Sequence, residues 1–269
     1  MKYYFIMIRN RITIILLVLS PLFFSLTSCF NMSFSLNGDR LVTVEPADST
    51  YVRASDSSAT KVLEIGDFES MDVSHAFEIV FSPQVAEGTA ELTAPVNLFD
   101  CIGSEVDDDG CLNVEYIRNV RLGSGIANPV LRLSSAEKFS SIDMTGATKV
   151  SSEDTLRLED LEIEVSGASG IELALMADKL YIRTSGASGA VLEGSCKELG
   201  IKVSGASKTD AQSLKADYCD VECSGASKIS VWCGKEIVLD CSGASKIDIY
   251  GPGVIAKQSV SGASSISKK

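Results

Sequence analysis

Hydrophobic and polar residues alternate along the C-terminal half of the chain, in short runs that end at a recurring glycine. In one such run Leu161, Ile163 and Val165 alternate with glutamates and precede Gly167, and a second alternating run begins at Ile171. The same arrangement returns around the glycines that follow. A period of two residues is typical of a β-strand with one buried face. The pattern therefore predicts a pair of strands joined at each glycine.

Each glycine belongs to a tetrapeptide with the consensus Ser-Gly-Ala-Ser, repeated seven times at intervals of 18 to 21 residues. A constant period of this length indicates one structural unit stacked on itself. Glycine suits a corner where the backbone turns sharply or approaches another backbone. We expect the alanine to fill the narrow interior of the corner and the hydroxyls to bond nearby backbone or the next coil. The corner glycines are Gly146, Gly167, Gly186, Gly205, Gly225, Gly243 and Gly262.

Strands that recur at a constant offset stack in parallel and in register, which defines the fold class. We predict an all-β protein built as a right-handed parallel β-helix, with about 19 residues per coil and regular repeats over residues 145–269. No segment shows the three-to-four-residue period of an amphipathic helix. The pattern therefore disfavours an α-helical solenoid of similar period.

The half of the domain before residue 145 is less regular. Residues 73–79 resemble a decayed repeat in which His75 stands at the glycine position. Residues 98–116 predict two strands joined by the reverse turn Asp107-Asp108-Asp109-Gly110. We expect opening coils plus a hairpin that caps the helix, because an open rung exposes unpaired backbone. At the other end, the charges of Ser267-Lys268-Lys269 are expected to discourage end-to-end stacking.

The N-terminal residues have the features of an export signal. A basic start and an apolar run from Ile12 to Leu26 precede the sequence Leu26-Thr27-Ser28-Cys29. This ending resembles a bacterial lipobox, so we predict a lipoprotein signal peptide over 1–28 and lipidation of Cys29. The alternatives are a transmembrane anchor, for which the run is short, and an ordinary cleaved signal. The polar residues 29–60 predict a flexible tether, and residues 61–269 a single domain.

The charge of the chain excludes some partners. The formal net charge is −12, and removal of residues 1–28 deletes three basic residues and no acidic ones, which makes it −15. Nucleic acids and anionic lipid surfaces require basic patches. We therefore expect no nucleic-acid partner and membrane contact only through the lipid anchor.

Few residues have the arrangement that catalysis or cofactor binding requires. His75 is the single histidine, and a turn residue is the expected role, with a general base as the alternative. The aspartates of residues 107–110 suit a turn better than a calcium loop, because the further ligands are missing. No phosphate loop or nucleophile elbow is present, so we predict no catalytic residue, no cofactor and no metal. A mixed-charge ladder, expected to be solvated, is formed by Asp178-Lys179, Lys197-Glu198, Lys215, Asp217 and Lys235-Glu236.

Seven cysteines follow Cys29. Cys219 and Cys223 lie about 13 Å apart along one strand, too far to share a zinc ion. Cys223 and Cys241 occupy equivalent positions in neighbouring coils, which predicts a separation of about 5 Å. They are either buried small apolar residues or a disulfide pair. Cys101 and Cys111 flank the predicted hairpin turn and are the better disulfide candidate, and an odd total leaves at least one thiol free.

The lipobox and the repeats Ser224–Ile229 and Ser242–Ile247 resemble the putative auto-transporter adhesin head GIN domain family, which is common among Bacteroidetes. The resemblance covers roughly residues 62–260. It implies a β-helical exported domain with an adhesin-like role and no established catalytic residues. The family name implies a translocator barrel, but the chain ends after the last repeat. We therefore expect it to reach the surface as a lipoprotein.

Together these features predict a lipid-anchored protein of the cell envelope, in the outer membrane and facing the surface or the periplasm. Its expected role is a non-catalytic, adhesin-like binding or structural module. A ladder of hydroxyls and small residues along the corners is the expected contact surface for a glycan or a protein. The alternatives are a β-helix lyase or hydrolase acting on polysaccharide, which needs clustered charged residues in a groove, and a purely structural envelope protein.

Overall fold

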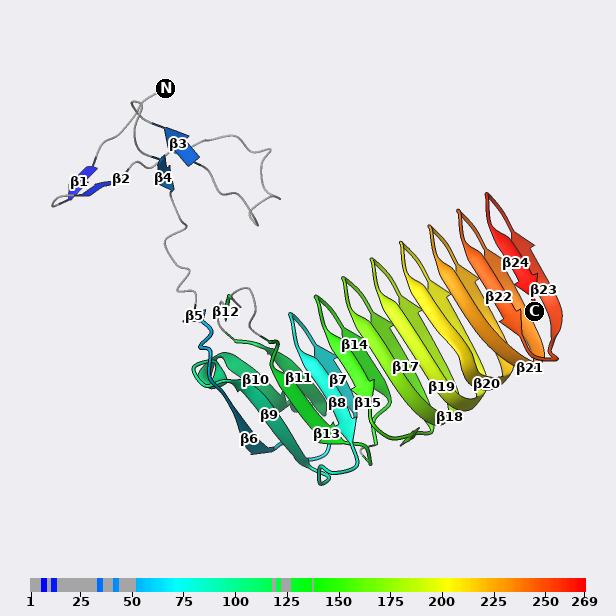
Figure 1. Ribbon diagram of the computed structural model, residues 1–269, viewed down its shortest axis with the longest axis horizontal. Coiled ribbons are helices and arrows are strands. Elements are labelled where there is room, and N and C mark those ends of the chain that lie inside the picture. Colours follow the sequence, from blue (N-terminus) through cyan, green and yellow to red (C-terminus); the bar gives the residue numbers. More distant parts are fainter. Residues whose placement is uncertain are drawn as a thin grey trace. The chain divides into compact units, whose positions relative to one another are not determined.

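The computed structural model describes residues 52–117, 120–121, 127–136 and 138–269, together with four short strands nearer the N-terminus (Figure 1). The chain divides into the units Met1–Ser49 and Thr50–Lys269. Apart from strands β1 to β4, the predicted signal peptide, Cys29 and most of the tether lie outside the described residues. No helix among the described residues is long and apolar enough to cross a membrane. The strands of the first unit form two antiparallel pairs, β1 (Ile6–Ile8) with β2 (Arg11–Thr13), and β3 (Ser33–Ser35) with β4 (Leu41–Thr43).

The second unit is a flattened β-solenoid with two faces that meet at the Ser-Gly-Ala-Ser corners (Figure 1). We call the strands that run into the corners the leading face and those that leave them the trailing face. Strands β18 to β21 each bend once, so their first halves belong to the trailing face and their second halves to the leading face. The prediction of an all-β parallel β-helix is confirmed.

The strands of the leading face are, in spatial order, β10 (Ile102–Val106), β11 (Cys111–Tyr116), β7 (Ser70–Val73), β14 (Ser141–Met144), β17 (Asp160–Val165), the second halves of β18 (Gly170–Thr184), β19 (Gly189–Val203), β20 (Lys208–Cys223) and β21 (Lys228–Cys241), and β23 (Val254–Val260). The strands of the trailing face are β6 (Ser58–Glu64), β9 (Thr89–Pro95), β13 (Val130–Ser134), β8 (Glu78–Ser82), β15 (Lys149–Ser152), the first halves of β18 to β21, β22 (Lys246–Tyr250) and β24 (Ser265–Lys268). Three short elements lie outside the two faces: β5 (Val52–Arg53) paired with β12 (Val120–Arg121), β16 (Leu156–Arg157) at a bend, and the 3-10 turn η1 (Phe99–Cys101).

The core is a set of apolar columns between the two faces. On the leading face Leu161 pairs with Leu180, which pairs with Leu199 in the next coil, and all three side chains are buried. The predicted alternation is therefore correct, because every second residue of these strands points inward. Burial of these columns supplies the main driving force for folding, at about 25 cal/mol per Å² of apolar surface.

The corners stack through their backbones. Each of the seven glycines has a positive φ between 70° and 87°, in the left-handed region. The amide of the following alanine donates a hydrogen bond of 2.6–2.9 Å to the carbonyl of the corner residue one coil below. A Cβ on any of these glycines would lie 2.3–2.6 Å from that carbonyl oxygen. Glycine is thus required twice, for its φ and for the close approach of the coils.

One expectation about the corner is wrong. The alanine is exposed at Ala147 and Ala168, and the residue after it fills the interior instead. The hydroxyls of Ser188 and Ser227 each donate to the carbonyl three residues earlier at 2.6 Å, which satisfies a buried polar group locally. A serine is small enough for the corner and brings its own partner. The second hydroxyl of each motif is therefore structural.

His75 begins the stack of corners, as its position in the decayed repeat predicts. It is the one non-glycine residue with positive φ among the described residues, at 71°. Its carbonyl accepts a 2.6 Å hydrogen bond from the amide of Ala147. Histidine tolerates the left-handed region better than β-branched residues do.

The first coils do not follow chain order. Strand β7 lies between β11 and β14, and β8 lies between β13 and β15. The coil made by β11 and β13 therefore sits on the N-terminal side of the coil made by β7 and β8, although it comes later in the chain. The predicted hairpin of β10 and β11 is confirmed, and its turn is built by Asp107, whose carboxylate accepts amides of Asp109 and Cys111 at 3.0 Å. These hydrogen bonds, of which the one from the Cys111 amide has the largest effect, lower the pKa of Asp107.

The two ends of the solenoid differ. At the N-terminal end, β6 and β9 form an antiparallel pair, and β6 begins at Ser58, inside the expected tether. At the C-terminal end, every residue of β23 is exposed. The N-terminal end thus has a cap of antiparallel strands, while the part of the chain that the structure describes places no such strands beside the last coil.

Substitution of Gly205 by alanine tests the stacking of the corners. The new Cβ would lie 2.6 Å from the carbonyl oxygen of Gly186, on a backbone with φ of 73°. We expect a loss of about 1–3 kcal/mol in the free energy of unfolding, measured by urea denaturation. The matched control is Gly189→Ala, where the Cβ meets nothing within 4 Å and φ is not positive. Equal stability of the two variants would show that the corner model is wrong.

Candidate functional site

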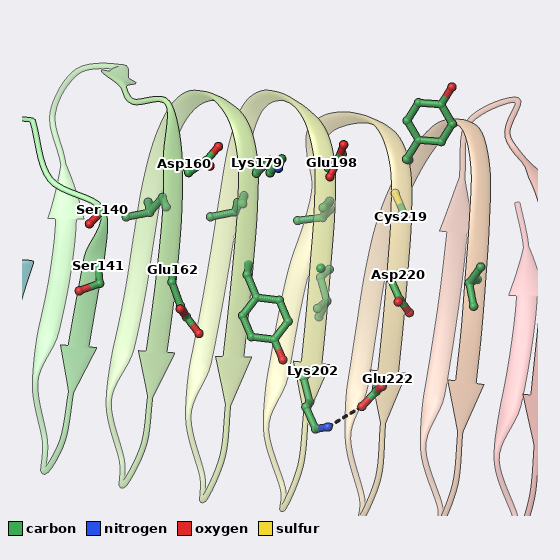
Figure 2. Close-up of a pocket in the computed structure, with 18 of the residues that line it drawn as sticks. Ser140, Ser141, Asp160, Glu162, Lys179, Glu198, Lys202, Cys219, Asp220 and Glu222 are labelled. Carbon is green, nitrogen blue, oxygen red and sulfur yellow. Dashed lines mark ion pairs between the residues drawn. The ribbon is translucent and has the colours of Figure 1, made fainter.

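A long, shallow hollow runs across the leading face. It has a volume of about 880 Å³ and extends from β14 over β17 to β21. Figure 2 shows its labelled side chains standing on successive strands rather than around a single point. The hollow therefore has the form of a track across six strands.

The alternation of the strands places three columns of outward side chains on this face. The upper column stands seven residues before each corner glycine, the middle column five, and the lower column three. The upper column contains Asp160, Lys179, Glu198, Tyr218 and Glu236; the middle column Ser141, Glu162, Tyr181, Gly200, Asp220 and Val238; and the lower column Asp143, Glu164, Arg183, Lys202, Glu222 and Asp240.

Tyr181 forms the apolar floor of the hollow. Its ring lies over Gly200 in the next coil, where a Cβ would be 2.5 Å from Cδ2 of the ring. Absence of a side chain at Gly200 thus lets the ring lie against the sheet. Arg183 lies beside it, with its guanidinium carbon 5.6 Å from the ring centroid and an ion pair to Glu164. A glycine within a strand often marks the close approach of another group. Gly200 was therefore the signal in the sequence that could have pointed to the position of the Tyr181 ring.

The rest of the lining combines apolar side chains at the base of the strands with outward charged groups, most of them acidic. It contains six carboxylates and two lysines, and Lys202 pairs with Glu222 at 2.6 Å (Figure 2). Tyr218 stands at the rim with 49% of its surface exposed. Carboxylates accept hydrogen bonds from hydroxyl or ammonium groups, and an aromatic ring packs on apolar faces. This arrangement can bind a polar, elongated ligand.

Three carboxylates stack without a cation between them at the N-terminal end of the lower column. Asp72, Asp143 and Glu164 are direct neighbours on parallel strands. The pKa of Asp143 is raised mainly by its partial burial and also by the negative charge of Glu164. The pKa of Asp72 is raised mainly by partial burial and also by the negative charge of Glu115. Like charges directly opposite each other are destabilising. This end of the face therefore carries a concentrated negative charge.

The predicted charge ladder forms at the bends between the two faces. Lys197 pairs with Asp178 at 2.7 Å and Lys235 with Asp217 at 2.9 Å, and all four side chains are exposed. Exposed pairs of this kind contribute little to stability. Lys179, Glu198 and Glu236 turn instead into the hollow.

His75 and the corner hydroxyls lie away from the hollow. Nδ1 of His75 is 2.8 Å from Oγ of Ser74, and its ring meets that of Tyr116 edge to face at 5.6 Å. His75 therefore acts as a turn residue. The expected hydroxyl ladder is reduced, because the second serine of most corners is buried and bonded to backbone.

The proposed disulfide between Cys101 and Cys111 is wrong. The hairpin pairs Ile102 with Tyr116 and Val106 with Leu112, so the two cysteines lie at opposite ends of it, roughly 15 Å apart. The structure, which describes all seven cysteines after Cys29, contains no disulfide among them, and Cys223 faces Cys241 in the next coil. The register thus confirms the predicted stacking of that pair.

Fold and hollow together define an all-β solenoid with an open hollow on its leading face. The chain belongs to the family described as "putative auto-transporter adhesin, head GIN domain", whose model matches residues 67–253. The resemblance seen in the repeats is thereby confirmed. No curated protein matches the chain.

Solved structures of similar shape include three from species of Bacteroides and Parabacteroides. A crystal structure of a putative adhesin from Bacteroides fragilis superposes with a TM-score of 0.74 at 18% identity, covering 81% of this chain and 100% of that one. A putative adhesin from Parabacteroides merdae gives 0.64 at 18% identity, with 81% and 99% covered. A putative lipid binding protein from Parabacteroides distasonis gives 0.64 at 15%, with 82% and 100% covered. At these identities the likeness shows the fold.

Replacement of Asp143 by asparagine tests the carboxylate stack. Because folding raises the pKa of Asp143, the folded chain binds its proton more tightly than the unfolded chain does, and the ionised group costs stability at neutral pH. We expect Asp143→Asn to raise the free energy of unfolding at pH 7 by about 0.2–1 kcal/mol, toward the lower end because of solvent screening. The gain should vanish as the pH falls below about 4, where the carboxyl is protonated in both states.

Asp178→Asn is the control for this measurement, because it removes a carboxylate that is paired with Lys197. We expect it to leave stability unchanged or slightly lower at pH 7. Thermal unfolding at pH 7 and pH 3.5 compares the two variants. A loss of stability in Asp143→Asn at pH 7 would contradict the repulsion.

Proposed function

We propose that this protein is a lipid-anchored, non-catalytic, adhesin-like module of the bacterial cell envelope that binds an elongated polar ligand along the hollow of the leading face. The observation that carries the proposal is the form of the hollow, in which polar groups repeat over six strands about 4.8 Å apart. An adhesin-like role agrees with the family of the chain. A track of repeated contacts suits a polymer better than a small substrate.

The chemistry of the lining favours a glycan. The ring of Tyr181 offers a flat apolar surface for the C–H face of a sugar, and Glu162 and Asp220, in the same column, can accept hydrogen bonds from its hydroxyls. The excess of carboxylates disfavours polyanions, including nucleic acids. One structural neighbour is described as lipid binding, but a lining with six carboxylates supports a hydrophilic ligand over an acyl chain.

A polysaccharide-degrading enzyme is the second candidate, and one feature favours it. Asp160, Lys179 and Glu198 stand next to one another in the upper column, on three successive strands (Figure 2). Acidic and basic groups held in a groove are what such catalysis needs. We favour binding because these side chains belong to a row that continues along the track rather than to a single centre.

Substitution of Tyr181 by alanine tests the ligand site. Purified protein is first screened against glycans of the host and of the envelope, and the dissociation constant of the strongest ligand is measured by calorimetry. We expect Tyr181→Ala to weaken binding about tenfold or more, because the apolar floor is lost. Gly200→Val, which displaces the ring of Tyr181 without removing it, should weaken binding in the same direction.

Tyr250→Ala is the matched control, since Tyr250 lies on β22 of the trailing face. Retained affinity in Tyr181→Ala and Gly200→Val would place the ligand elsewhere. Release of products from the bound polysaccharide, abolished by Asp160→Asn, would establish the enzyme instead.

Substitution of Cys29 by serine tests the anchor. If Cys29 carries the lipid, the variant should lose incorporation of a labelled fatty acid and leave the membrane fraction, because the attachment atom is missing. Cys111→Ser is the control and should remain lipidated. Protease treatment of intact cells, with a periplasmic marker, then tells whether the anchored protein faces outward. A membrane-bound, labelled Cys29→Ser variant would contradict the proposed anchor.

A further inference from the structure

Two thiols face each other inside the solenoid near its C-terminal end. Cys223 and Cys241 each stand two residues before a corner glycine, in consecutive coils, and are direct partners in the register of β20 and β21. Their Sγ atoms are 2.8 Å apart, and the residues are 4% and 0% exposed. The equivalent position in earlier coils holds Val165 and Val203, so a thiol is not needed to fill this space.

The geometry is close to that of a disulfide. Neighbouring strands place paired Cα atoms about 4.8 Å apart, within the range of 4.4–6.8 Å that disulfides span. A covalent S–S bond is about 2.05 Å long, so the sulfur atoms need to approach by about 0.8 Å. Rotation of the two side chains accommodates a change of this size. The backbone can therefore remain in register.

A disulfide at this place in the fold would hold the C-terminal coils together. The solenoid is closed at its N-terminal end by antiparallel strands, whereas every residue of β23 is exposed. Each coil of a solenoid contacts only its neighbours, so a terminal coil with an exposed strand opens at low cost. Cys241 lies in the last coil that is covered on both sides, directly before the open one. A covalent link here would stop opening from passing into the coils that carry the hollow.

We propose that Cys223 and Cys241 form a disulfide that joins two adjacent coils and closes the C-terminal end of the solenoid. The oxidant is a disulfide, either of a small-molecule thiol or of a protein, of the kind present in oxidising compartments outside the cytosol. In the cell this depends on the export proposed above, but the chemistry can be tested without it.

The reaction balances as thiol–disulfide exchange. The thiolate of one cysteine attacks the oxidant and forms a mixed disulfide, releasing one thiolate of the oxidant. The second cysteine loses its proton and attacks the mixed disulfide, releasing the other. The two cysteines together lose two electrons and two protons, and the oxidant becomes two thiols. Burial, with the hydrogen bond to Cys241, raises the pKa of Cys223 to about 12, so the exchange takes place while the terminal coils are open.

The other cysteines are placed less favourably. Cys101 and Cys111 lie at opposite ends of their hairpin, and Cys196 is separated from Cys233 by the coil of Ala216. The one rival pair is Cys219 with Cys233, whose thiols interact across a bend. The register partner of Cys219 is Ile237, so these two residues do not face each other directly. Their hydrogen bonds to the carbonyls of Trp232 and Glu236 satisfy both thiols.

Peptide mapping distinguishes the pairs. The full chain is reduced, incubated with oxidised glutathione, alkylated with iodoacetamide and digested with trypsin without reductant. Cleavage after lysine places Cys219 and Cys223 in residues 216–228, Cys233 in 229–235 and Cys241 in 236–246. We expect a cross-link between 216–228 and 236–246 that persists in Cys219→Val and is absent in Cys223→Val. A cross-link from 216–228 to 229–235 would assign the disulfide to the rival pair and overturn the proposal.

Stability gives an independent readout. The two cysteines are 18 residues apart in the chain. A disulfide that closes this loop should raise the Tm of the oxidised chain by roughly 5–10 °C over that of the reduced chain. The shift should disappear in Cys241→Val, whose side chain matches the valines of the earlier coils, and remain in Cys111→Ala. Complete alkylation of both thiols after oxidation, with an unchanged Tm, would overturn the proposal.

Discussion

The stacking of one backbone carbonyl on the next alanine amide is the interaction on which the solenoid depends. At each corner the chain turns on a glycine with positive φ, and the next coil rests on its carbonyl at hydrogen-bond distance. A Cβ at that position would clash with the carbonyl oxygen of the coil below. The constraint sets the spacing of the coils and allows no slip by one residue, because a slip would put a Cβ into the contact and turn the apolar columns outward.

A common register turns each repeat position into a column, and the surface follows from it. Tyr181 can lie against the sheet because the next residue of its column is Gly200. The same rule places Asp72, Asp143 and Glu164 together, although they are far apart in the chain. The register thus makes like charges direct neighbours. The resulting repulsion costs little stability where the face is exposed, because solvent screens it. The outward side chains of this face therefore form rows that continue from coil to coil, and no single residue forms a centre.

The ends of the solenoid show where regular stacking stops. At the N-terminal end the chain departs from sequential order, since the coil of β11 and β13 lies outside that of β7 and β8. This order leaves antiparallel strands at the boundary, which cover the backbone groups of the first coil. At the C-terminal end, the described residues place no antiparallel strands beside the coil of β23 and β24. The buried thiols of Cys223 and Cys241 lie beside that weaker end.

The sequence by itself determined the class of fold, the length of the coil and the positions of the corners. These depend on local rules, namely alternation with a period of two and the need for glycine at positive φ, and even His75 could be placed at a corner by its spacing. The tertiary structure alone decided which coils are neighbours at the N-terminal end, which residue of the corner points inward and which outward side chains line the hollow. Local rules could not supply these, because the order of coils and the packing of Tyr181 over Gly200 depend on contacts between residues distant in the chain. The error at Cys101 and Cys111 has the same origin: both flank a turn, yet strand register places them at its two ends.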